Sequence, residues 1–249
     1  KFNVVAPDTK NFQINFDEFE KLVNKNTKAV IINSPNNPSG AVYSEQTIKK
    51  LADFLSKKSE EYGTHIFIIT DEPYREIVYD GVEVPYVTKY YNDTIVCYSY
   101  SKSLSLPGER IGFILVPDEA YESKKLYAAV CGAGRALGYV CAPSLFQKVI
   151  AKCVGDVNLY KKNRDLLYDG LTELGYECFK PDGAFYMFVK ALESDAENFC
   201  EKAKEEDLLL VAATDFGCPG YVRISYCVDE DMIKRSFKAF KALKEKYAK

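Results

Sequence analysis

The sequence is poor in residue types on which many enzymes depend. Its 249 residues contain no tryptophan, two methionines and a single histidine, His65. A Ser-His-Asp triad, a multi-histidine metal site or a histidine general base would each have to use this one residue. His65 opens the apolar run 65–70, and we interpret it as structural. Chemistry must therefore be carried by Lys, Arg, Asp or Tyr side chains, or by a cofactor.

Other absences exclude further classes of protein. The eight cysteines include no C-x-x-C pair, so the sequence indicates neither a metal site nor a disulfide scaffold, and it predicts reduced thiols in the cytoplasm. No apolar run approaches the roughly 18–20 residues of a membrane-spanning helix, and no signal-peptide pattern opens the chain. A net charge of −3 without blocks of Lys or Arg argues against nucleic acid or a membrane as the main partner.

Apolar runs alternate with helical periodicity, which is typical of βαβ units and a mostly parallel sheet. The helices expected in the first half lie at 17–23 and after Ser44, whose helix carries Ile48, Leu51 and Leu55 on one face. The expected strands are 29–33, which reads as buried on both sides, 66–70, 94–98 and 111–116. The fold class predicted is therefore α/β.

The pattern changes in the second half. Helical periodicity dominates from 121 to 174, with expected interruptions at 132–134 and Pro143. A smaller α+β unit follows. Its expected strands are 184–189, 208–212 and 221–226, and its helices are 195–204 and a closing one capped by Asp229. We predict two domains, 1–160 and 161–249.

Two polar segments follow predicted strands. Asn33–Gly40 is a loop fixed by two prolines and a glycine, and Thr70–Tyr74 places Asp71 and a phenol where a buried strand ends. Open α/β sheets bind ligands at the carboxyl ends of their strands. A rigid turn for the first segment and a simple cap for Asp71 are the structural alternatives.

A third segment, Ser99–Gly112, brings hydroxyl groups, Lys102 and Arg110 within twelve residues between two strands. Serine and arginine suit a phosphate, and a lysine beside it suits a Schiff base. The alternative is a polar loop with solvated charges. The fourth segment is 221–226, where strand alternation puts Arg223 on one face with Tyr221 and Ser225. This arginine fits a ligand carboxylate or, alternatively, an internal salt bridge.

Together these residue types fit pyridoxal 5′-phosphate (PLP). The sequence also resembles the fold-type I, class I/II aminotransferases, which are similar to aspartate aminotransferase. The resemblance covers nearly the whole chain, in the family's order, and the matching motifs are NSPNNPSG at 33–40, DEPY at 71–74, SYSKS at 99–103, GERIG at 108–112, GAFY at 183–186 and YVRIS at 221–225. It implies the PLP-dependent transferase fold, amino acid and 2-oxo acid substrates, and a homodimer.

The resemblance also implies roles for single residues. Lys102 looks like the lysine that links to PLP and moves the proton at the substrate Cα. Asp71 looks like the partner of the protonated ring nitrogen. Asn37 and Tyr74 look like donors to the ring's phenolic oxygen, and Asn37 also looks like part of the substrate site.

The remaining implied roles concern anionic groups. Ser99 and Arg110 look like phosphate ligands, and Ser101 is a further candidate. Arg223 looks like the residue that binds the substrate α-carboxylate. The GAFY segment 183–186 resembles a strand of the small domain and is interpreted as structural.

The sequence departs from the family pattern in places. The family's chains are longer at the amino end, so the sequence resembles a carboxyl-terminal part, which we expect to lack full activity alone. The segments 131–143 and 211–220 match poorly, and the second leaves the preferred amino acid open. A PLP-dependent C–S lyase and a PLP-sensing effector domain of a transcription regulator remain alternatives. Formation of glutamate from 2-oxoglutarate would distinguish a transaminase from a lyase. A DNA-binding segment encoded upstream would indicate the regulator.

Overall fold

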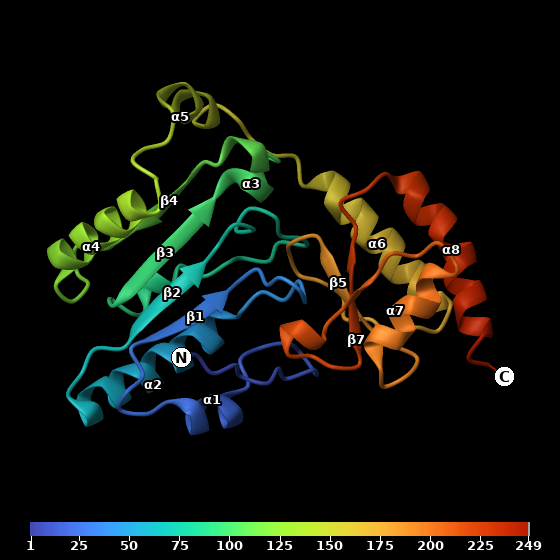
Figure 1. The fold of residues 1–249 in the computed structure, drawn as a ribbon, viewed down its shortest axis with the longest axis horizontal. Coiled ribbons are helices and arrows are strands. Elements are labelled where there is room, and N and C mark those ends of the chain that lie inside the picture. The colour runs from blue at the N-terminus through green and yellow to red at the C-terminus, as the bar shows by residue number, and fades with distance from the viewer. Residues whose placement is uncertain (249) are drawn as a thin grey trace.

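The computed structural model describes residues 1–248, whose strands form two separate sheets (Figure 1). The first sheet has the order β1-β2-β3-β4, with β1 at Ala29–Asn33, β2 at Phe67–Asp71, β3 at Thr94–Ser99 and β4 at Gly112–Leu115. The first three strands run parallel, and β4 pairs antiparallel with β3. The prediction of an α/β fold with a mostly parallel sheet is confirmed.

Helix α2 (Glu45–Tyr62) covers one face of this sheet, as its sequence predicts. Its Ile48, Leu51 and Leu55 are buried in one core cluster with residues of β1 and β2. The Ser44 side chain accepts a hydrogen bond from the Thr47 backbone N–H at the start of the helix. The shorter helix α1 (Phe16–Leu22) adds Phe19 to the same cluster.

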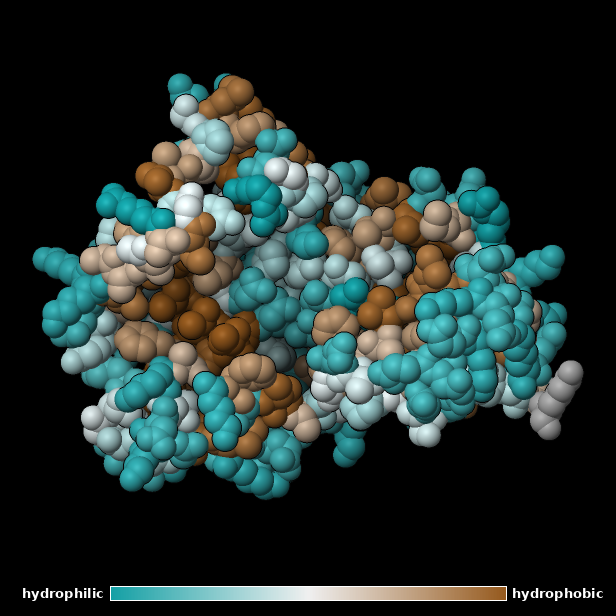
Figure 2. All heavy atoms as spheres, in the orientation of Figure 1, coloured by the Kyte–Doolittle hydropathy of each residue, from teal (hydrophilic) through white to brown (hydrophobic). Residues whose placement is uncertain are grey.

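The other face of the first sheet is largely open. Figure 2 shows apolar residues gathered over this part of the molecule. The prediction that the strand 29–33 is buried on both sides is wrong, because Ile31 is 73% exposed whereas Ile32 is buried against the helices. Successive side chains of a strand point to opposite faces. Within residues 1–248, α1 and α2 pack on only one face of β1.

The middle of the chain contains short helices around the edge strand β4. They are η1 (Val87–Lys89), α3 (Tyr100–Ser103), η2 (Pro107–Glu109), α4 (Ser123–Ala136) and α5 (Ser144–Ile150). The expected interruption at 132–134 is wrong, because α4 continues through both glycines and ends before Gly138, whose φ is +88°. The predicted break at Pro143 is confirmed, since this residue immediately precedes α5.

The second sheet has the antiparallel order β5-β7-β6 and packs against three helices. Its elements are α6 (Asn158–Glu173), β5 (Tyr186–Lys190), α7 (Ala196–Lys204), β6 (Val211–Ala212), η3 (Thr214–Phe216), β7 (Tyr221–Ser225) and α8 (Glu230–Glu245). The strand expected at 208–212 is therefore reduced to two residues. Asp229 is the N-cap residue of α8, but its side chain makes no capping hydrogen bond. No helix within residues 1–248 has the length and hydropathy that a bilayer span requires.

The two sheets are joined through closely packed backbone at Gly40 and Gly183. The backbone N–H of Gly183 donates to the carbonyl of Gly40, and that of Ala184 donates to the carbonyl of Ile77 (both 2.9 Å). A side chain at Gly183 would lie 2.7 Å from the Ile77 carbonyl oxygen, and one at Gly40 would lie 2.5 Å from Pro181 Cβ. This close approach explains physically why both motifs contain a glycine.

Candidate functional site

The carboxyl ends of the three parallel strands bring the polar segments of the sequence together. Asn33 pairs with Asp71, and Asp71 pairs with Cys97, in adjacent strands. Strand β3 then ends at Ser99, which leads directly into α3 and Lys102. Three segments that lie far apart in the sequence therefore share one edge of the sheet, as parallel strands require.

Asp71 at the end of β2 receives hydrogen bonds from a neighbouring amide. Asn33 Nδ2 donates to the Asp71 carboxylate (3.2 Å) and to its backbone carbonyl (2.8 Å). Partial desolvation, and the negative charge of Glu72, raise the pKa of the Asp71 carboxyl above its usual value. No Lys, Arg or His within residues 1–248 lies at ion-pair distance from it, so Asp71 is available to a cationic or N–H partner.

Asn37 connects the loop after β1 to the second sheet. Its backbone N–H donates to Asn33 Oδ1 (2.6 Å), and its own Oδ1 accepts from Arg223 Nη1 (3.0 Å). These two residues are 186 positions apart in the sequence. The structure therefore brings together two residues that the sequence predicted for one site.

Arg223 lies in β7 on the face that alternation predicted. Its guanidinium carbon lies 4.6 Å from the ring centroid of Tyr186 and 5.0 Å from that of Phe216. The internal salt bridge left open as an alternative is not formed, since no carboxylate among residues 1–248 lies within ion-pair distance of Arg223. Its charge is held by aromatic faces and one amide oxygen, which leaves it able to bind an anion.

Tyr74 lies between the two sheets and is almost fully buried. Its hydroxyl points toward that of Tyr186 at 3.4 Å, and its ring packs edge-on against Phe185. Burial is the main cause, and the Tyr186 hydroxyl a second one, of a strong rise in the pKa of Tyr74. Tyr74 is therefore a protonated hydrogen-bond donor at neutral pH.

Lys102 lies in the one-turn helix α3, which Ser99 caps by accepting a hydrogen bond from the Ser101 backbone N–H (3.1 Å). Its ammonium nitrogen is 6.0 Å from the ring centroid of Tyr74 and 5.7 Å from that of Phe185. Among residues 1–248 no carboxylate is paired with it. An amine against two aromatic rings and free of an ion pair is suited to react with a carbonyl group.

Ser99, Ser101 and Arg110 are brought close through the backbone. The two serine hydroxyl oxygens are 2.6 Å apart. The Tyr100 N–H donates to the carbonyl of Ile111 (3.1 Å), which places Arg110 beside the start of α3. The Arg110 side chain, however, donates to the Pro107 carbonyl of its own loop and does not contact either serine.

The sequence interpretation missed part of this site. It treated 183–186 as a structural strand, whereas Phe185 lies against Lys102 and Tyr186 against both Tyr74 and Arg223. Ala184 explains the difference, because its φ of +56° turns the chain at the start of β5. Strand alternation along 184–189 could have indicated the contact between Tyr186 and Arg223. It places residue 186 on the same face as residue 188, and residue 188 pairs with Arg223 in the sheet.

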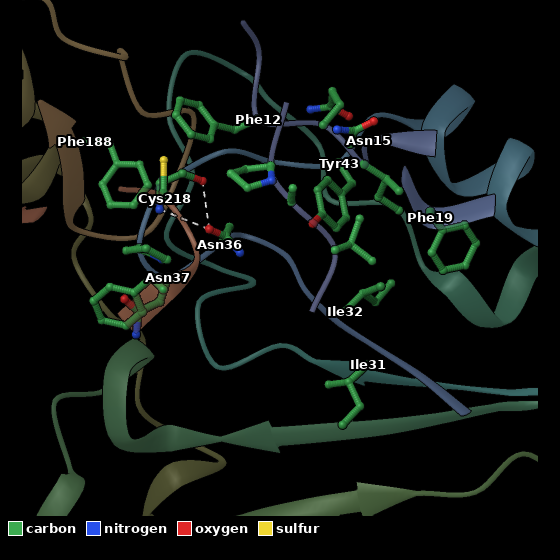
Figure 3. Close-up of a pocket in the computed structure, with 18 of the residues that line it drawn as sticks. Phe12, Asn15, Phe19, Ile31, Ile32, Asn36, Asn37, Tyr43, Phe188 and Cys218 are labelled. Atoms are coloured by element: carbon green, nitrogen blue, oxygen red, sulfur yellow. Dashed lines mark hydrogen bonds between the residues drawn. The ribbon is translucent and has the colours of Figure 1, made fainter. Parts of the chain in front are cut away.

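A cavity of about 260 Å³ adjoins Asn37 (Figure 3). Phe12, Phe188 and Cys218 lie near Asn37 at one end, and Phe19 lies at the other. Its lining carries no charged side chain, and neither Lys102 nor Asp71 borders it. The cavity is thus separate from the amine and the carboxylate of the candidate site.

Known proteins resemble this chain over almost its full length. A sequence model of the family described as aminotransferase class I and II matches residues 2–240. The aromatic-amino-acid aminotransferase 2 of Thermococcus litoralis is 32% identical over 252 residues, which cover 96% of this chain and 63% of that protein. The probable aspartate/prephenate aminotransferase of Aquifex aeolicus is also 32% identical, over 95% of this chain and 62% of that protein.

Solved structures agree with these sequence matches. The crystal structure of an amino transferase from Eubacterium rectale has a TM-score of 0.96 and 72% identity, covering 98% of this chain and 62% of its own. Aspartate aminotransferase from Thermotoga maritima has a TM-score of 0.84 and 28% identity, covering 98% of this chain and 64% of its own. The chain therefore spans less than two thirds of the length of these proteins.

Proposed function

This chain belongs to the aminotransferase class I and II family, and from that premise we propose that it is the part of a PLP-dependent aminotransferase that transfers an amino group between an L-amino acid and a 2-oxo acid. The observation that carries the proposal is the position of Lys102. Its ammonium group has aromatic neighbours and no carboxylate partner among the described residues, and it follows the strand next to the one that ends at Asp71.

The residues at the sheet edge fit PLP by their chemistry. The raised pKa of Asp71 indicates a carboxylate that lacks a cation, which the protonated ring nitrogen would supply. Lys102 would hold the aldehyde carbon covalently. Asn37 and Tyr74 would donate to the phenolic oxygen. The phosphate would be bound by three residues, which are Ser99, Ser101 and Arg110. When bound, PLP withdraws electrons from the substrate Cα.

The chain's own residues would bind and orient the amino acid. Arg223 would bind the substrate carboxylate through its guanidinium, which the rings of Tyr186 and Phe216 hold in place. Lys102 would hold and return the proton at the substrate Cα. Phe185 and Tyr74 would exclude water from the Lys102 nitrogen, so that this proton is not exchanged with solvent. A homodimer in the cytoplasm is part of the same proposal.

The test compares two lysines in the presence of PLP. Lys102→Ala should abolish the visible absorbance that PLP acquires when it is linked to a lysine, whereas Lys238→Ala, at an exposed position of α8, should keep it. Mass spectrometry after borohydride reduction should place PLP on the peptide that contains Lys102. Labelling of other lysines with equal efficiency would contradict the proposal. With an amino acid and 2-oxoglutarate, formation of glutamate distinguishes a transaminase from a lyase.

A further inference from the structure

Tyr186 lies between the two halves of the candidate site. It is the first residue of β5, is 8% exposed and pairs with Ser225 of β7. Its neighbour on the same face, Phe188, pairs with Arg223. The ring of Tyr186 therefore supports the guanidinium of Arg223, at 4.6 Å from the ring centroid. This contact is a cation–π interaction between a buried ring and a half-buried guanidinium.

The hydroxyl of Tyr186 faces the other half of the site. It lies 3.4 Å from the Tyr74 hydroxyl, which is its one hydrogen-bond partner in the described chain, and the two rings meet edge to face with centroids 6.0 Å apart. The charged groups around this pair come from three other elements. Asp71 ends β2, Lys102 lies in α3, and Arg223 lies in β7.

The two hydroxyl groups can form a directed chain. Tyr74 has one proton to donate, and in the structure it points to Tyr186. When a ligand oxygen accepts that proton instead, the Tyr186 hydroxyl can rotate and donate its own proton to the Tyr74 oxygen. Hydrogen bonds in such a chain polarise and strengthen one another. Without the second hydroxyl, the buried Tyr74 oxygen would lose this donor.

We propose that Tyr186 is a positioning residue that couples the two binding groups, with its hydroxyl strengthening Tyr74 as a donor and its ring holding Arg223 for a carboxylate. This inference rests on the proposed function. Tyr186 touches no reacting atom in this scheme and acts through its two neighbours. A purely structural role in the core would need only the volume of the ring, and this difference is testable.

Two substitutions separate the hydroxyl from the ring. Tyr186→Phe keeps the ring and removes the hydroxyl, whereas Tyr186→Met fills similar volume without an aromatic face. Tyr160→Phe is the matched control, because its ring also packs on Phe185 but its hydroxyl faces Ser105 rather than Tyr74. Circular dichroism and thermal melting establish that each variant folds.

The first readout is the pH at which the absorbance of PLP linked to Lys102 has completed half of its change in a pH titration, here called the pH midpoint. Tyr186→Phe should raise this midpoint by about 0.5–1 pH unit, because a weaker Tyr74 donor stabilises the anionic phenolic oxygen less. The second readout is the affinity for 3-phenylpropanoate, an unreactive carboxylate, at constant ionic strength. Tyr186→Met should weaken it about 3- to 10-fold, whereas Tyr186→Phe should stay within twofold.

The outcomes distinguish this inference from the proposed function. If the unmodified chain shows no Lys102-dependent absorbance, the proposed function fails. If the chain binds PLP but Tyr186→Phe has the same pH midpoint as the unmodified chain and Tyr160→Phe, the coupling is overturned. Unchanged carboxylate affinity in a folded Tyr186→Met variant overturns it equally. If Tyr186→Met does not fold, the midpoint of Tyr186→Phe alone decides.

Discussion

Asp71 carries a charge that its surroundings do not neutralise. The Asn33 amide is its hydrogen-bond donor, and partial desolvation, followed by repulsion from Glu72, raises the pKa of its carboxyl. Because this pKa is higher in the folded chain than in the unfolded chain, folding favours the protonated form. The stabilisation is present at low pH and is lost as the pH rises through the folded pKa. At neutral pH the carboxylate therefore lowers the free energy of unfolding unless a cationic partner binds.

Asp71→Asn should consequently have opposite effects with and without PLP. Without PLP at pH 7 we expect Tm to rise by about 1–3 °C, and this gain should vanish at acidic pH, where the carboxyl is protonated in both the folded and the unfolded chain. With PLP present, the rise in Tm that the ligand causes should be smaller than in the unmodified chain. Thermal melts at several pH values measure both effects.

The control for this prediction is Asp118→Asn, at an exposed position after β4. It should leave the Tm and its response to PLP unchanged. A lower Tm for Asp71→Asn at pH 7 without PLP would show that the carboxylate stabilises the fold, contrary to the argument.

At the scale of elements, the site depends on how closely β3 and β4 approach. Gly112 pairs with Ser99, and a side chain at Gly112 would lie 2.3 Å from the carbonyl oxygen of Tyr98. Backbone cannot move away as a flexible side chain can, so any residue other than glycine must separate the two strands. Arg110 and Ser99 lie on either side of this contact, and their separation would increase with it.

Gly112→Ala should therefore lower the free energy of unfolding by about 1–3 kcal/mol and weaken PLP binding. Gly132→Ala is the matched control, because nothing lies within 4 Å of the added carbon and the residue is inside α4. That change should raise stability by up to about 1 kcal/mol. Urea denaturation measures both. Equal stability of Gly112→Ala and the unmodified chain would mean that the strands are not constrained at this point.

Sequence signals within one segment predicted where helices and strands form better than they predicted which faces of those elements are covered. Helix α2 was predictable because its cap at Ser44 and its apolar stripe lie within one segment. The exposure of Ile31 was not, since an apolar run does not show which face of a strand is covered. The two glycines of α4 led to a wrong prediction of a break, because a glycine inside a helix lowers its stability by only about 1 kcal/mol and need not end it.

The same distinction applies to the candidate site. The positions of Asp71 and Lys102 at the sheet edge could be predicted, because each lies within a few residues of the end of a strand that the sequence indicates. The position of Tyr186 could not be predicted, because it is defined by a contact with Tyr74, which is 112 positions away in the sequence. The turn that brings these two tyrosines together includes the positive φ of Ala184, which an alanine does not signal in a sequence.

At the scale of the whole molecule, we propose that the chain divides near residue 160 into units 1–160 and 161–249 that are firmly joined. Arg164 of the second unit is 2% exposed. It forms an ion pair with Asp80 of the first unit (2.6 Å), whereas its contacts with Asp165 and with the Pro181 carbonyl lie within the second unit. Together with the backbone hydrogen bonds from Gly183 to Gly40 and from Ala184 to Ile77, this ion pair should hold the units together even without a covalent link.

The segment 151–157 connects α5 to α6 and provides the test. It is mostly exposed, has no regular secondary structure, and contains Lys152. Limited trypsin treatment should cut after Lys152 before it cuts the helices. A protease needs an exposed segment whose backbone can unfold locally, and helical backbone is held by its hydrogen bonds. We expect two fragments on a denaturing gel that still elute as one species on size exclusion, whereas Lys152→Gln should delay the cut. Separate elution of the fragments would show that the contacts of Arg164 and of the Gly40–Gly183 junction do not suffice to join the units.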